Sequence, residues 1–91
     1  MSFNINEMFS VAGKTAIVTG GSRGIGRAIC LMLAEHGAWV AINYTQNEEA
    51  AHEALTKVNA IGAEGMIVRA DVSREEEVNR MVEEVRNRFG P

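Results

Sequence analysis

The feature of this chain that most constrains its fold is a regular alternation of two sequence patterns. Short apolar runs rich in β-branched residues predict strands that are covered on both faces of a sheet. These runs span residues 15–19, 39–43 and 65–70. Each run is followed by apolar residues at helical spacing, and the expected helices span residues 24–36, 46–61 and 73–89. Strands that alternate with helices in this way favour a parallel sheet with right-handed crossovers.

An α/β chain with this order of elements corresponds to the N-terminal half of a Rossmann-type, three-layer α/β/α fold. We predict the strand order third, second, first, with a free edge on the first strand where a fourth strand would pair. The 91 residues are slightly fewer than the commonest domain size of about 100–150. We therefore expect residues 1–91 to form a single, incomplete dinucleotide-binding domain.

Composition excludes several functional classes. The formal net charge is −3, whereas a protein that binds a phosphate backbone normally has a surplus of basic residues, so we expect no nucleic-acid partner. The single cysteine cannot form an internal disulfide, and no Cys/His cluster has metal-ligand spacing. No apolar run approaches the roughly 20 residues that span a bilayer, and the first residues do not resemble a signal peptide. These observations favour a cytoplasmic protein without a metal or a membrane partner.

Local signals predict how individual residues of the helices and strands are used. Apolar residues that share one face of the first helix are Ile25, Ala28, Ile29, Met32 and Leu33. Two pairs, Thr45 with Glu48 and Ser73 with Glu76, have capping-box spacing at the start of the later helices. Cys30 is expected to be a small buried apolar group, and Trp39 is expected to pack against a helix.

A glycine-rich segment, Thr19–Gly26, lies between the first strand and the first helix. Gly20 allows a sharp exit from the strand, while Gly24 and Gly26 let the backbone approach a pyrophosphate and the helix pack closely on the sheet. The amides of the first helical turn would then face the anion. The alternative interpretation is a tight connection that binds nothing.

The segment Thr19–Gly26 resembles the cofactor signature of the short-chain dehydrogenase/reductase family. Val11–Thr15 is similar to this family's approach to its first strand, and Arg88–Pro91 to its approach to the fourth. Within the family the chain looks most like bacterial 3-oxoacyl-acyl-carrier-protein reductases and their glucose-dehydrogenase-like relatives. We expect the cofactor to be contacted by Gly20, Ser22, Arg23, Gly24, Ile25 and Gly26.

The charge pattern favours NADP(H) rather than NAD as the cofactor. In this fold an acidic residue about 20 residues beyond the glycine turn binds the ribose hydroxyls of NAD. The second strand instead ends in Asn43, Tyr44 and Thr45, which offer hydrogen-bonding groups without a negative charge. Arg23 supplies a guanidinium suited to an added phosphate, although it is also interpretable as a solvated surface charge.

The resemblance also implies an adenine subsite. It implies that Asp71 accepts a hydrogen bond from the adenine amino group and that the Val72 backbone contacts the ring. Asp71 has a second interpretation as a turn-forming residue ahead of the last helix, and both roles are compatible.

The resemblance implies an NADP-dependent oxidoreductase that reduces a keto group, for example that of a 3-oxoacyl thioester in fatty acid biosynthesis. The family's catalytic Ser, Tyr and Lys are expected beyond Pro91, so no catalytic residue is assigned within these residues. Alternatives are a stand-alone nucleotide-binding or interaction module and an NAD(P)-dependent sugar or alcohol dehydrogenase. Unpaired apolar edges of a half-domain favour pairing with another chain, so we expect a homo-oligomer.

Overall fold

The computed structural model describes residues 12–22 and 24–90, and within them the chain forms three strands and three helices in strict alternation. In chain order these elements are β1 (Thr15–Val18), α2 (Gly24–Glu35), β2 (Trp39–Tyr44), α3 (Glu48–Ala60), β3 (Gly65–Arg69) and α4 (Glu75–Phe89). Each predicted strand and helix is present, with ends that differ by only a few residues from those expected.

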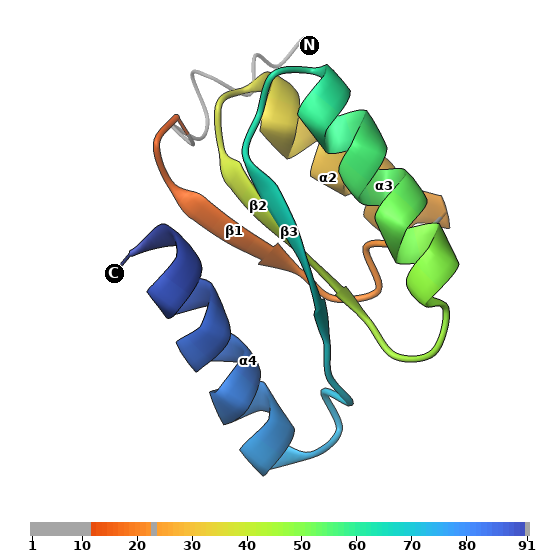
Figure 1. Ribbon diagram of the computed structural model, residues 1–91, viewed down its shortest axis with the longest axis vertical. Helices are drawn as coiled ribbons and strands as arrows, with labels where there is room; N and C mark the ends of the chain where they lie inside the picture. The colour runs from red at the N-terminus through yellow and green to blue at the C-terminus, as the bar shows by residue number, and fades with distance from the viewer. Residues whose placement is uncertain (1–11, 23, 91) are drawn as a thin grey trace, which may run out of the picture.

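The strands form a parallel sheet in the order β1-β2-β3 (Figure 1). β2 lies in the centre, with Ile17 of β1 opposite Ala41 and Ile42 opposite Ile67 of β3. This is the predicted order, and it leaves the outer edge of β1 unpaired among the described residues. The parallel arrangement brings the C-terminal ends of all described strands to one end of the sheet.

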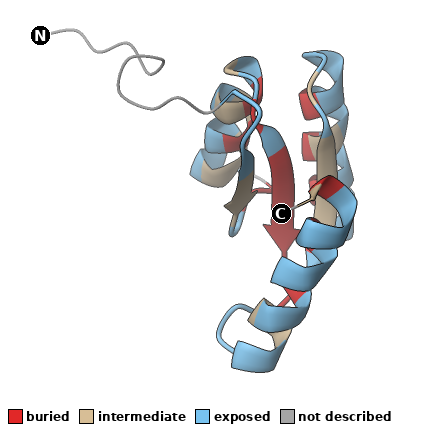
Figure 2. Ribbon diagram, turned by 90° about the vertical axis from the view of Figure 1, so that its left-hand side faces the viewer, coloured by how far each residue is buried: buried red, intermediate tan, exposed pale blue. Residues whose placement is uncertain are grey.

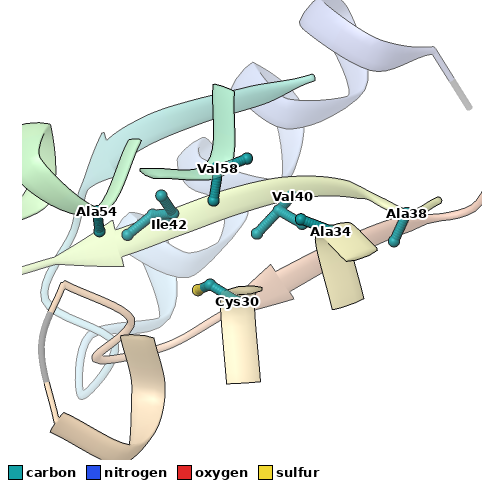
Figure 3. Packing of buried hydrophobic residues seen from close by; sticks show 7 residues of the cluster. All are labelled: Cys30, Ala34, Ala38, Val40, Ile42, Ala54 and Val58. Carbon is teal, nitrogen blue, oxygen red and sulfur yellow. The ribbon is translucent and has the colours of Figure 1, made fainter. Parts of the chain in front are cut away.

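The sheet lies between helices, with α2 and α3 on one face and α4 on the other (Figure 1). Successive side chains of a strand point to opposite faces, so β2 supplies residues to both layers. Val40 and Ile42 face α2 and α3, where they pack against Cys30, Ala34, Ala54 and Val58 (Figure 3). The cluster under α4 contains Ala41, Val68, Ala70, Met81, Val85 and Phe89. Figure 2 shows β2 as the buried centre between the two layers.

Only part of the apolar face predicted for α2 is buried in this core. Ile25 is 82% exposed, and Ile29 and Met32 are also exposed. The buried residues of α2 are Cys30 and Ala34 instead, because small side chains let the helix lie close to β2. The exposed apolar residues of α2 therefore form a stripe, which consists of Ile25, Ala28, Ile29 and Met32 and which we call the α2 stripe.

The capping predictions for the later helices were wrong in detail. Asn47 caps α3, since its Oδ1 accepts a hydrogen bond from the Ala50 amide at 2.9 Å, and Thr45 does not serve as the cap. α4 begins at Glu75 after Arg74, which makes no side-chain cap, because Ser73 donates its hydroxyl to Asp71 instead. Trp39 packs on a helix as expected, with its ring centroid 5.6 Å from that of Phe89. Among the described residues, no helix is both long and apolar enough to cross a membrane.

Candidate cofactor-binding site

The glycine-rich turn connects the end of β1 to the start of α2 (Figure 1). Gly20 and Gly24 have φ angles of 66° and 64°, in the left-handed region that glycine adopts without a steric penalty. These two positions reverse the chain within a few residues, so that α2 starts directly beside the strand from which it came. The backbone at this turn is therefore left without side chains at the points of sharpest bending.

Gly26 and Gly21 lie where neighbouring atoms leave no room for a side chain. A Cβ on Gly26 would collide with the carbonyl oxygen of Gly20, so the first turn of α2 packs directly on the backbone of the glycine-rich turn. A Cβ on Gly21 would lie 2.8 Å from the Cys30 Sγ beneath it. Cys30 is fully buried in the core, as expected for a packing residue, and this burial raises the pKa of its thiol to about 11.

The first turn of α2 holds no acidic side chain. The other two described helices differ, because α3 begins with Glu48 and Glu49 and α4 with Glu75, Glu76 and Glu77. Carboxylates at a helix N-terminus interact favourably with the partial positive charge of the exposed amides. At α2 that partial charge is not offset by a local carboxylate, which suits the binding of an external anion such as a pyrophosphate.

A cavity of about 970 Å³ lies between the turn and the segment that follows β2. One wall comes from Gly20 and Ser22 of the turn, and the other comes from the end of β2 and the start of α3. The residues of the second wall are Tyr44, Thr45, Gln46, Asn47, Glu48 and Glu49. Four predicted contact residues, Gly20, Ser22, Tyr44 and Thr45, thus line one cavity. Its position at the C-terminal ends of parallel strands is typical of ligand sites in open α/β sheets.

Tyr44 is the last residue of β2, and only 7% of its surface is exposed. Its hydroxyl lies 3.3 Å from the Glu48 carboxylate, to which it donates a hydrogen bond. Burial and the neighbouring Glu48 raise the pKa of Tyr44, so the hydroxyl stays protonated at neutral pH. Tyr44 therefore lines the cavity with a protonated hydroxyl that acts as a hydrogen-bond donor.

Asn43 lies in the same segment but faces another direction. Its side chain is 2% exposed, and its amide Nδ2 donates to the carbonyl oxygens of Val68 at 3.3 Å and Ala70 at 3.2 Å. Its backbone carbonyl accepts a hydrogen bond from the Gly21 amide at 3.1 Å. The amide of Asn43 thus joins β2 to the end of β3, and its side chain does not line the cavity.

Asp71 and Val72 follow β3 at the same end of the sheet, but they do not line this cavity. Asp71 forms the turn that the sequence suggested, accepting hydrogen bonds on Oδ1 from the Ser73 hydroxyl at 2.6 Å and the Ser73 amide at 3.0 Å. These bonds from Ser73 lower the pKa of Asp71. Val72 is exposed.

Sequence reasoning missed the part of the cavity formed by Gln46, Asn47, Glu48 and Glu49. Their position directly after the second strand was the available signal, since loops at this edge carry ligand contacts in open α/β sheets. Arg23 lies outside the described residues. Among residues 12–22 and 24–90, no group of His, Cys, Asp or Glu side chains is arranged to hold a metal ion.

Residues 14–91 match the family described as short chain dehydrogenase. The chain belongs to this family. The match covers the turn, the cavity and all described strands, so the predicted family is confirmed over residues 14–91.

Individual members of the family are similar to this chain at moderate identity. A 3-oxoacyl-[acyl-carrier-protein] reductase, FabG, of Staphylococcus epidermidis is 44% identical over 77 residues, which are 85% of this chain and 32% of the relative. A short chain dehydrogenase from Burkholderia cenocepacia, solved in complex with NADP, is 40% identical with a TM-score of 0.83 over 90% of this chain and 34% of that one. An NAD+-bound xylitol dehydrogenase is 36% identical with a TM-score of 0.82 over 90% of this chain and 31% of that one. The chain therefore spans about a third of the length of these relatives.

Proposed function

We propose that this chain is the N-terminal, cofactor-binding part of an NADP(H)-dependent short-chain oxidoreductase that reduces a keto group. The observation that carries the proposal is the glycine-rich turn: its residues Gly20 and Ser22 line the cavity, and the helix that begins directly after it has no acidic side chain in its first turn. Membership of the short-chain dehydrogenase family supports the class of reaction. The keto group of a 3-oxoacyl thioester is the proposed substrate, because the chain is similar to a 3-oxoacyl-[acyl-carrier-protein] reductase.

The residues present fit a dinucleotide. A cofactor pyrophosphate needs backbone amides without intervening side chains, and the absence of a Cβ at Gly26 lets the first turn of α2 pack directly on the backbone of the glycine-rich turn. In the proposed complex, Gly20, Ser22, Arg23, Gly24, Ile25 and Gly26 hold the pyrophosphate side. Tyr44 and Thr45 bind the adenosine ribose, while Asp71 and Val72 lie at the adenine end. When bound, the nicotinamide ring supplies the hydride.

The choice of NADP(H) depends on charge. Tyr44 ends β2 and Thr45 follows it, and neither carries a carboxylate that would repel a ribose phosphate, while Arg23 supplies a cation in the sequence of the turn. Glu48 and Glu49 also line the cavity, and their negative charges oppose a phosphate on that side, so the proposed preference depends on the Arg23 cation. A dehydrogenase in complex with NADP is among the similar structures, which supports this choice.

The described residues contribute binding and orientation rather than proton transfer. Carbonyl reduction requires an acid that protonates the developing alkoxide. Tyr44 is the only tyrosine of the chain, and its hydroxyl donates to Glu48 at the ribose wall of the cavity. A module that binds the nucleotide without catalysis is the alternative that this observation favours. The likeness to an NAD+-bound xylitol dehydrogenase favours a sugar-alcohol dehydrogenase as the other alternative.

Titration calorimetry with NADPH and NADH tests the proposal. The wild-type chain is expected to bind NADPH more tightly than NADH, and Arg23→Ala is expected to weaken NADPH binding about 10-fold or more while changing NADH binding little. Arg86→Ala, which removes an exposed arginine of α4 paired with Glu83, is the matched control and should change neither affinity. Failure to bind either cofactor refutes the proposal. Equal affinities for NADPH and NADH that do not change in Arg23→Ala refute only the preference for NADP(H).

A further inference from the structure

Arg27 stands out because its guanidinium is bound inside the fold rather than solvated. It lies in the first turns of α2, and its side chain is only 20% exposed. Its Nε donates to the carbonyl oxygen of Ser22 at 2.7 Å, and its Nη2 donates to the carbonyl oxygen of Ala50 at 3.1 Å. Glu53 lies 3.6 Å from Nη2 and balances part of the charge.

The two carbonyl groups belong to opposite sides of the candidate site. Ser22 is part of the glycine-rich turn and lines one wall of the cavity. Ala50 lies in the first turn of α3, directly after Glu48 and Glu49 of the other wall. One side chain therefore spans the distance between the walls, while Arg27 itself does not line the cavity.

The chemistry of the guanidinium suits this task. It is planar, permanently charged and presents several N–H donors in fixed directions, so two carbonyl groups that bind it are held at a fixed separation. A lysine ammonium carries a compact charge on a flexible stem and lacks this fixed fork. Hydrogen bonds to a charged donor are also stronger than neutral ones, which makes the link resistant to opening.

We propose that Arg27 is a positioning residue that sets the separation between the glycine-rich turn and the start of α3, and thereby the affinity for the cofactor, without contacting it. The inference rests on the proposed function, since it assigns a role in binding at the same cavity. A ligand that touches both walls must depend on the separation, whereas a ligand that touches only the turn depends on it little.

The test compares ADP, which carries adenosine and a pyrophosphate, with inorganic pyrophosphate alone. In Arg27→Leu, ADP affinity is expected to fall about 10-fold and NADPH affinity by a similar factor, the loss of roughly one charge-assisted hydrogen bond. Pyrophosphate affinity is expected to change about 2-fold or less. Arg27→Lys should lose part of the ADP affinity and remain folded. Arg86→Leu, an exposed arginine of α4 paired with Glu83, is the matched control and should bind like the wild type.

The outcomes separate this role from a purely structural one. Urea unfolding of each variant reports stability independently of binding, and a structural role alone would lower stability without separating ADP from pyrophosphate. Wild-type affinities in Arg27→Lys, or equal losses for the two ligands in Arg27→Leu, overturn the proposal. If Arg27→Leu does not fold, Arg27→Lys decides alone through its ADP affinity. A wild-type chain that binds no nucleotide refutes the proposed function and this inference together. If the wild type binds ADP and NADPH and the Arg27 variants bind them with the same affinity, only the inference is refuted.

Discussion

Replacing Asn43 with Asp tests the role that the structure gives to this side chain at the end of β2. On charge alone, an acid in this segment would favour NAD over NADP. The structure leads to a different expectation, because the Nδ2 of Asn43 donates to the Val68 and Ala70 carbonyl oxygens at 3.3 and 3.2 Å. An Asp carboxylate has no hydrogen to donate and would face both carbonyl oxygens in a buried site. Asn43→Asp is therefore expected to destabilise the fold rather than to switch the cofactor.

The size of the effect follows from burial and from pH. A protonated Asp can donate one hydrogen bond, so at about pH 4 only one bond is lost, at a cost of about 1–2 kcal/mol. Burial raises the folded-state pKa of the new carboxyl above its unfolded value of about 3.9. Stability is then lost as the pH rises, by about 1.4 kcal/mol for each unit between these two pKa values. We expect a total destabilisation of about 3–5 kcal/mol at neutral pH, comparable with the whole stability of a small domain.

Urea unfolding followed by the fluorescence of Trp39 measures this cost, because Trp39 is the only tryptophan and packs on Phe89 of α4. Asn79→Asp, on the exposed surface of α4, is the matched control and should change stability by about 0.5 kcal/mol or less. The contrary result is an Asn43→Asp variant that is as stable as the wild type at neutral pH and whose preference moves from NADPH to NADH. That result would mean that the side chain faces the cofactor.

Four further predictions follow from the same contacts. Tyr44, the only tyrosine, should ionise above its ordinary pKa of 10.0 in an ultraviolet titration. The stability that this shift provides is lost as the pH rises past 10.0, and Glu48→Gln should lower the midpoint of the Tyr44 titration. Cys30 should resist thiol reagents at mildly alkaline pH in the folded chain but react rapidly in urea, since burial raises its pKa to about 11. Fast labelling without urea would contradict its buried position. Gly26→Ala should lower the free energy of unfolding by about 3 kcal/mol and abolish NADPH binding, because the new Cβ would meet the Gly20 backbone. Unchanged unfolding and binding would refute the close packing of turn and helix. The chain should self-associate in sedimentation through the exposed α2 stripe, and Ile29→Lys should shift it toward the monomer; a stable wild-type monomer contradicts this.

The sheet and its order could be predicted because the responsible signals are local. The nearly continuous apolar runs around Ile17, Ile42 and Ile67 predict strands that are covered on both faces, and the intervening helices impose parallel crossovers. The turn was equally accessible, since Gly20, Gly24 and Gly26 stand between a strand and a helix. Gly20 has the left-handed φ angle that a sharp exit requires, and Gly26 packs closely as expected. Gly24 differs from the expectation, because it has a left-handed φ angle and a Cβ there would meet no neighbouring atom.

The direction of individual side chains could not be predicted in the same way. β2 is buried on both faces, so its apolar pattern does not reveal that Asn43 points toward the β3 backbone while Tyr44 borders the cavity. α2 is apolar around most of its surface, and small residues such as Cys30 decide which side approaches the sheet. The contacts of Arg27 join segments 5 and 23 residues away, which no sequence spacing indicates.

In the proposed complex, the backbone amides of the glycine-rich turn bind the cofactor pyrophosphate. Titrating an isotopically labelled chain with NADPH while following its backbone amide resonances by NMR tests this claim most directly. The largest shifts are expected at Gly20, Ser22 and Gly24–Gly26, with further changes at Tyr44 and Thr45 across the cavity. Shifts that leave the turn unchanged and gather instead around Trp39 and Ile61, at the opposite end of the sheet, would contradict it.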